Sequence, residues 1–145
     1  MPQATYQDAD LILKLYEMRR EEKLRAARAW FAANFSAKSF SEALEKYPPG
    51  TEHNSYFRMV TSYWDMAASF IARGIMHEEL FFENNGEMLF VWERIRGLVD
   101  EYRTSRNNPL LLRNLEKAAT KHIQWLNQNA PGAYESFQAM MNPKK

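Results

Sequence analysis

Hydrophobic positions along the chain recur every three or four residues, and glycine and proline fall almost wholly between these runs. This spacing is typical of amphipathic helices, and no segment alternates in the way that predicts a half-buried strand. The pattern predicts an all-α fold, a single-domain bundle of about six helices over residues 1–145, with a long N-terminal helix and frayed ends at 1–7 and 142–145. The expected helices cover residues 8–35, 39–47, 53–73, 77–83, 87–103 and 108–130, and a last helical turn or two follows over 133–141.

Two of these segments carry the widest apolar arcs. In 53–73 and again in 87–103, aromatic and aliphatic residues fill one side when residues are placed about 100° apart. Trp64 and Trp92 each belong to the apolar arc of their segment and are predicted to be core residues. The two segments are therefore expected to form a buried antiparallel pair at the centre of the bundle.

The composition narrows the classes of function. The 145 residues carry a formal net charge of +1 and no cysteine, which removes thiolate chemistry and fits a reducing cytoplasm. No apolar run approaches the ~20 residues that span a bilayer. Nucleic-acid binding is the last-ranked alternative, because glutamates interleave with the basic residues Arg19, Arg20, Arg25 and Arg28.

A histidine interrupts the apolar arc of the sixth predicted helix. His122 lies among leucines and alanines beside Trp125. One interpretation is a ligand-binding or acid–base group in a pocket; the other is a neutral core histidine with a hydrogen-bond partner. Since no second catalytic residue stands at a recognisable spacing, the core interpretation is favoured.

The first predicted helix carries charges inside its apolar stripe. Arg19, Glu22 and Lys23 separate an early apolar part from a late one. These residues either meet opposite charges on a second copy of the chain, or line a section that bends away from the core and stays wet. In a twofold interface, Arg19 of one copy would meet Glu22 of the other.

Two further features have structural and functional interpretations. Phe90 and Gly97 share the outer side of the fifth predicted helix, which predicts either a closely crossing helix or a tolerated glycine on a wet face. The group His77, Glu78, Glu79 and Glu83 resembles a metal cluster, but it lacks the histidine spacing of zinc or di-iron helices, so no metal site is predicted. Acidic residues are in any case expected in the first turn of a helix.

The segment 62–102 combines an aromatic-rich helix, the turn Arg73-Gly74-Ile75-Met76, the acidic start Glu78-Glu79-Leu80 and a tryptophan-containing helix. This combination resembles the bacterial family called domain of unknown function 4760. The resemblance implies a helical bacterial domain with no assigned activity and no catalytic residues to carry over. In that family a membrane helix often precedes the domain, and no such helix is present here.

The sequence therefore favours a cytoplasmic, non-enzymatic helical bundle that acts through protein contacts, as a homo-oligomer or with another protein partner. We expect no catalytic residue, cofactor or metal ligand, no nucleic-acid partner and no membrane span. The alternative is a small-molecule-binding or enzymatic bundle with a pocket around His122 and Trp125. The predicted interface consists of Arg19, Glu22, Lys23, Phe90 and Gly97.

Overall fold

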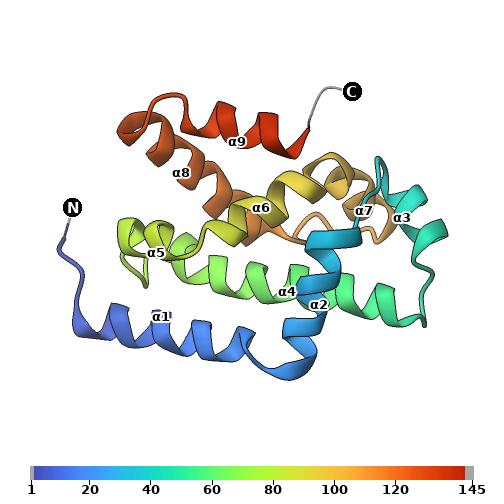
Figure 1. Ribbon diagram of the computed structural model, residues 1–145, viewed down its shortest axis with the longest axis horizontal. Helices are drawn as coiled ribbons and strands as arrows, with labels where there is room; N and C mark the ends of the chain where they lie inside the picture. Colours follow the sequence, from blue (N-terminus) through green and yellow to red (C-terminus); the bar gives the residue numbers. More distant parts are fainter. Residues whose placement is uncertain (1, 143–145) are drawn as a thin grey trace.

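The protein is all-helical in the part that this computed structural model describes, residues 2–142, and no strand occurs there (Figure 1). In Figure 1, α1 and α4 run along the lower part of the molecule, α6 lies above α4, and α9 covers the top. The helices are more numerous and shorter than predicted. In chain order they are α1 (Tyr6–Arg19), α2 (Glu22–Asn34), α3 (Phe40–Lys46), α4 (Glu52–Ala72), α5 (Glu78–Asn84), α6 (Gly86–Ile95), the 3₁₀ turn η1 (Arg96–Leu98), α7 (Val99–Ser105), α8 (Arg113–Asn129) and α9 (Ala133–Met141).

Helix α4 is the centre of the core. Trp64 is completely buried and Trp92 nearly so, as their arcs predicted. The predicted pairing of their helices is only partly right, because α4 packs more extensively against α8 and α2 than against α6. Fully buried alanines on two of these helices, Ala67 on α4 and Ala118 on α8, leave room for close helix packing.

The predicted continuous helix over 8–35 is wrong, because the chain bends at Arg20 and Glu21. Glu21 is extended there, and its carboxylate accepts the N–H groups of Lys23 and Leu24 at 3.1 and 3.0 Å, so it caps α2. The carbonyl of Arg19, at the end of α1, accepts Nη1 of Arg28 at 2.8 Å. The side chains of Glu21 and Arg28 thus replace the backbone bonds that a continuous helix would make.

The start of α1 also differs from the prediction. Thr5 is the N-cap, and Asp8, where the predicted helix began, completes a capping box from the third helical position. The helix therefore begins at Tyr6, inside the segment predicted to fray. Asp8 also accepts the N–H of His77 at 2.9 Å, and this bond, the largest cause, lowers the pKa of the Asp8 carboxyl. Asp8 therefore ties α1 to the start of α5.

The predicted helices over 87–103 and 108–130 are interrupted or shortened. A 3₁₀ turn at Gly97 separates α6 from α7, which fits the low helix propensity of glycine. Asn108, where the predicted helix began, forms a turn with Leu110, and α8 begins only at Arg113. There, Oδ1 of Asp65 on α4 accepts the N–H of Leu115 at 2.9 Å, so α4 supplies the cap. Asp65 is half-buried.

Several helix ends agree with the predictions. Ser39 caps α3 and His77 caps α5, each through its own side chain. Gly74 follows α4 with a φ of +70°, the left-handed conformation expected at that position. Helix α9 forms over the residues predicted for the last helical turns. Of the predicted frayed basic tail, residues 143–145 lie outside the described part of the chain.

No helix among the described residues combines the length and apolar character needed to cross a membrane.

Candidate functional site

His122 lies inside the core, as the apolar arc predicted, and the structure closes the space around it. The side chain is 3% exposed, and its ring stacks on Phe82 at 4.6 Å and tilts toward half-buried Trp125 at 5.9 Å. Nδ1 has no hydrogen-bond partner among the described residues, so the partner expected of a core histidine is missing at this nitrogen. Burial lowers the pKa of His122 to about 4, so the ring is neutral at pH 7.

These three residues, His122, Phe82 and Trp125, are called the His122 cluster below. Neither His122 nor Trp125 lines any of the five cavities described for this structure. The cluster is packed aromatic core in this structure, and the pocket around His122 and Trp125 stays a prediction.

Arg19 was predicted to face a partner, but the structure buries it against α4. It is 8% exposed, and its Nη1 donates to the hydroxyl of Tyr63 at 3.1 Å. The guanidinium also lies over the ring of Trp64, 5.2 Å from its centroid. Tyr63 in turn donates to the carbonyl of Leu15 at 2.6 Å, and burial raises the pKa of Tyr63 although Arg19 opposes this. Arg19 thus stabilises the end of α1 within one chain.

A half-buried arginine, Arg28, completes this polar region. Nε and Nη2 of Arg28 donate to the two carboxylate oxygens of Glu87 at 2.8 and 3.0 Å, the bidentate geometry of a strong pair. Trp64 donates its ring N–H to the same carboxylate at 3.1 Å. Together with the bond from Arg28 to the Arg19 carbonyl, this network fixes the bend between α1 and α2. Of the four basic residues considered for nucleic acid, Arg19 is buried, Arg28 is paired with Glu87, and Arg20 and Arg25 are exposed.

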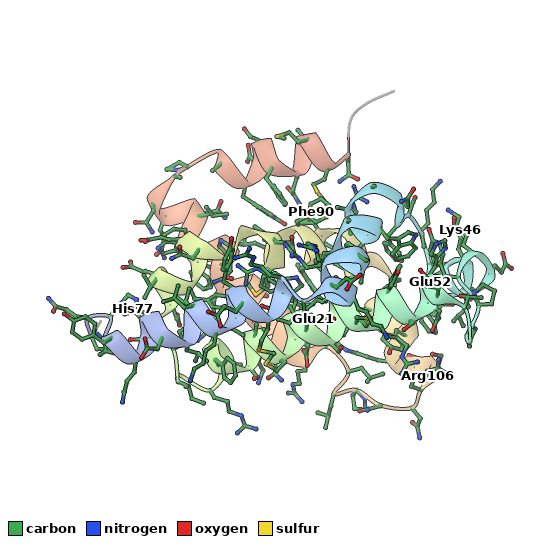
Figure 2. All side chains as sticks on the ribbon, turned by 60° about the horizontal axis from the view of Figure 1, so that its bottom comes forward. Glu21, Lys46, Glu52, His77, Phe90 and Arg106 are labelled. Carbon is green, nitrogen blue, oxygen red and sulfur yellow. The ribbon has the colours of Figure 1, made fainter. Side chains whose placement is uncertain are left out.

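The remaining predicted interface residues lie in different surroundings. Glu22 and Lys23 are exposed in the first turn of α2. Phe90 is half-buried and packs edge-on against Phe31 of α2 at 6.3 Å (Figure 2). Gly97 is exposed. Beyond its own turn of the chain, no described atom comes within 4 Å of the position that a Cβ would take. No described helix therefore crosses closely at Gly97.

His77 and Glu78, near the start of α5, make contacts that stabilise the fold. Nδ1 of His77 accepts the N–H of Leu80 at 3.2 Å, and Glu78 pairs with Lys121 of α8 at 3.1 Å. Within residues 2–142, no three side chains of the metal-binding types come together in a geometry that holds an ion.

Helix α1 carries several large apolar side chains that are exposed to solvent. Figure 2 shows this helix along the front of the molecule, with its outward side chains in solvent. Tyr6 is 93% exposed, Leu13 59%, and Tyr16 and Met18 about half. Only Leu15 and Arg19 of α1 are buried. We call the exposed side of residues 6–20 the outer face of α1.

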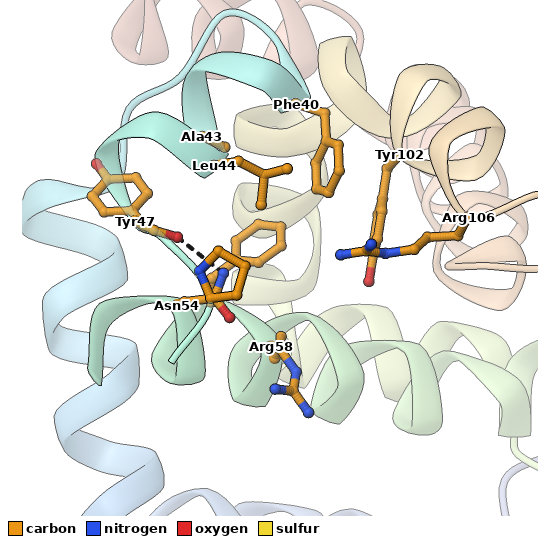
Figure 3. Close-up of a pocket in the computed structure, with 10 residues that line it drawn as sticks. Phe40, Ala43, Leu44, Tyr47, Asn54, Arg58, Tyr102 and Arg106 are labelled. Carbon is orange, nitrogen blue, oxygen red and sulfur yellow. Dashed lines mark hydrogen bonds between the residues drawn. The ribbon is translucent and has the colours of Figure 1, made fainter. Parts of the chain in front are cut away.

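A pocket lies between α3, α4 and the end of α7, and we call it the α3–α7 pocket (Figure 3). Its volume is about 290 Å³. Phe40 and Leu44 come from α3 and Phe57 from α4, and they form an apolar wall. Tyr102 of α7 stacks on Phe40 with a centroid distance of 4.6 Å, so two aromatic rings border the same space.

Two arginines complete the pocket's lining. Arg106, which directly follows α7, extends toward the pocket in Figure 3, and Arg58 of α4 lies at its lower edge. The Arg106 guanidinium lies over the Phe40 ring, 5.7 Å from its centroid. Neither arginine forms an ion pair with any described residue. The pocket thus combines an apolar wall with positive charge.

Sequence reasoning placed none of these pocket residues in a site. Arg58 lies on the polar side of an amphipathic helix and Arg106 in a turn, so each has the local surroundings of an ordinary solvated residue. Phe40 and Phe57 have the local pattern of core residues. Only the packing of α3 and α7 against the start of α4 brings the four together, and no local spacing in the sequence signals it.

The family comparison agrees with the resemblance in 62–102 and extends it. The model of the family described as "Domain of unknown function (DUF4760)" matches residues 4–125, which include α1 to α7 and most of α8. Helix α9 lies beyond the match. No curated protein and no solved structure gives a significant match. Because the family model covers most of the chain, this protein belongs to the DUF4760 family.

Proposed function

We propose that this domain acts through protein contacts, as a homodimer joined by the outer face of α1, and not as an enzyme. The observation that carries the proposal is the order of charges along this exposed helix. Asp10, Lys14, Glu17 and Arg20 are all exposed, and their charges alternate from negative to positive in chain order.

A row of four alternating charges pairs with the same row on a second helix that runs in the opposite direction, because each charge then faces one of opposite sign. When two copies of α1 lie antiparallel across a twofold axis, Asp10 of one faces Arg20 of the other, and Lys14 faces Glu17. The opposite charges needed by this surface are thus supplied by a second copy of the same chain. This is why a second copy is preferred to an unrelated partner.

Apolar side chains between the charges supply the contact energy. In the antiparallel arrangement Leu13 of one copy lies opposite Tyr16 of the other. These side chains are each about half exposed in the single chain, so the contact removes apolar surface from water. Aromatic residues are also enriched in interfaces. Because Arg19 is buried, the proposed interface uses the exposed residues of the outer face of α1 instead.

The proposal that the domain is not an enzyme is supported by the state of His122. This ring is neutral at pH 7, closed off by Phe82 and Trp125, and far less accessible than a general acid or base requires.

Sedimentation equilibrium at micromolar concentrations tests the dimer. Lys14→Glu places two negative charges opposite each other at both symmetric contacts, so we expect the dissociation constant to rise about tenfold. Glu17→Lys alone should weaken the dimer similarly, and the double variant Lys14→Glu/Glu17→Lys should recover most of the loss. Lys117→Glu, at an exposed position on α8, is the matched control and should leave the dimer unchanged.

Circular dichroism of each variant checks that the exposed substitutions leave the fold intact. A parent protein that remains monomeric at its highest soluble concentration would contradict the proposal. So would a dimer that is insensitive to both single variants, since its interface would then lie elsewhere.

A further inference from the structure

We infer that the α3–α7 pocket binds a small amphipathic anion, an organic carboxylate with an aromatic ring or a short hydrocarbon chain. This site is separate from the outer face of α1, and the inference does not depend on the proposed dimer. It rests on the combination of apolar wall, unpaired cations and limited volume.

The wall of the pocket suits the apolar part of such a ligand. Phe40 and Phe57 are 4% and 5% exposed, so their rings are held in place by the core. Half-buried Leu44 and Tyr102 border the same space. A ring placed here would contact Phe40 and Tyr102 in the offset or edge-on geometries that aromatic groups prefer.

The charges at the pocket differ from the arginines that hold the fold together. Arg28 pairs with Glu87, and Arg103 pairs with Glu116 at 2.9 Å while donating to the carbonyl of Leu111. Arg58 and Arg106 make no such contact with a described residue. Their positive charge is available to a ligand.

The Arg106 side chain favours a carboxylate in particular. Its guanidinium carbon lies 5.7 Å from the centroid of the Phe40 ring, and it forms no ion pair with a described residue. The N–H groups of a guanidinium match the two oxygens of a carboxylate in a bidentate pair. The backbone N–H of Arg106 donates to the carbonyl of Tyr102 at 3.2 Å. The Arg106 side chain therefore starts from a fixed point at the end of α7.

The volume limits the size of the ligand. A cavity of about 290 Å³ is at the small end of ligand pockets, which implies a ligand of roughly ten to fifteen non-hydrogen atoms. A ligand of this size binds with a dissociation constant on the order of 0.1–1 mM. Nucleotides and long-chain lipids are too large to be enclosed.

Phenylacetate is a suitable probe, with phenylacetamide as its neutral counterpart of the same shape. In two-dimensional NMR titrations of the isotopically labelled protein, phenylacetate should shift the signals of Ala43, Leu44 and Asn54, which line the pocket. Phenylacetamide should bind at least fivefold more weakly, because it lacks the charge.

Variants at the two arginines test the charge contact directly. Arg106→Gln and Arg58→Gln should each weaken phenylacetate binding at least fivefold. Each should also reduce the difference in affinity between phenylacetate and phenylacetamide. Arg25→Gln is the matched control, because Arg25 is exposed on α2 and lies outside the pocket. It should bind phenylacetate like the parent.

A variant that fills the pocket tests the location without changing charge. Ala43→Leu adds volume to the wall and should abolish the phenylacetate shifts, while circular dichroism confirms that the protein is folded. Absence of saturable shifts in the parent would overturn the inference. Equal affinity for phenylacetate and phenylacetamide, or shifts confined to residues away from this pocket, would overturn it as well.

Discussion

Two aromatic groups in this molecule, the His122 cluster and the α3–α7 pocket, resemble each other in composition and differ in access. Each combines aromatic rings with a nitrogen-containing side chain that has donors or acceptors to spare. In the cluster Phe82 of α5 stacks on His122 of α8, and Trp125 of the same helix lies against it. At the pocket the short helices α3 and α7 meet only the start of α4, and space remains between them.

The difference shows that residue types alone do not define a site. Inside the core, burial disfavours the protonated form of the imidazole, and the packed rings around it leave no room for a ligand. Arginines at the edge of an open pocket keep their positive charge and their hydrogen-bond donors. The same contrast predicts how the two regions respond to substitution and to pH.

Truncation of a ring should have its largest effect in the His122 cluster. Phe82 is 4% exposed and stacks on His122, so Phe82→Ala should lower the free energy of unfolding by about 3–5 kcal/mol. Tyr102→Ala, at the half-buried edge of the pocket, should cost only about 1–2 kcal/mol, because the space it leaves is open to water. Urea denaturation measures both, and equal losses would contradict the distinction between closed cluster and open pocket.

As the pH falls, the protonation of His122 should destabilise the protein at a higher pH than the protonation of its carboxylates. The folded-state pKa of His122, about 4, lies below its unfolded value of 6.5, so the unfolded state binds the proton more strongly. Stability is therefore full above pH 6.5 and falls as the pH drops toward 4. Between pH 7 and pH 5 the expected loss is about 2 kcal/mol.

His122→Phe isolates this effect, because it keeps a ring and removes the titrating group. Its stability should be nearly constant between pH 7 and pH 5, measured by urea denaturation at each pH. His53→Gln, at an exposed histidine, is the control and should keep the parent's pH dependence. The carboxyls whose pKa is lowered by hydrogen bonds, such as Asp8 and Glu42, lose their contribution only below about pH 4.5. An unchanged pH dependence in His122→Phe would show that another group is responsible.

The sequence predicts these two regions unequally. The apolar arc of the sixth predicted helix was enough to place His122 in the core, because burial follows from periodicity within one helix. The bend at Glu21 was not predicted, because glutamate is an unusual N-cap residue. The start of α8 at Arg113 was not predicted either, because it depends on a side chain that is distant in the sequence. Asp65 of α4 caps α8, and no local pattern contains that contact.

The pocket was missed for the same reason. Arg58 and Arg106 come from different helices and acquire a common role only through the packing of α3 and α7. The sequence predicted charges inside the apolar stripe of α1 but not which of them are exposed. Arg19 points inward to Tyr63, because the bend after α1 brings it against α4.

The loop between α7 and α8 connects the two regions, and its end is held by Asp65. Leu112 there has a φ of +56°, an unfavourable conformation for a branched side chain that its burial maintains. Asp65→Ala removes the cap from Leu115 and should lower the free energy of unfolding by about 1 kcal/mol. Thermal denaturation measures the loss. Asp100→Ala, at an exposed position on α7, is a suitable control, and an equal effect of the two would contradict the capping role.

The smallest expected effect concerns the contact that holds α3 against α7. The Glu101 carboxylate accepts the hydroxyl and the N–H of Ser41 at 2.6 and 3.0 Å, and these bonds lower the pKa of Glu101. The group is exposed, so Glu101→Gln should barely change the melting temperature. It should nevertheless loosen α3, which is short and has few buried residues, and amide hydrogen exchange in residues 40–46 should become faster. Exchange in α8 around His122 should stay as slow as in the parent, because buried packing and not exposed hydrogen bonds closes that region. Equal acceleration in both segments would show that the pocket and the cluster open together, and the contrast between them would fail.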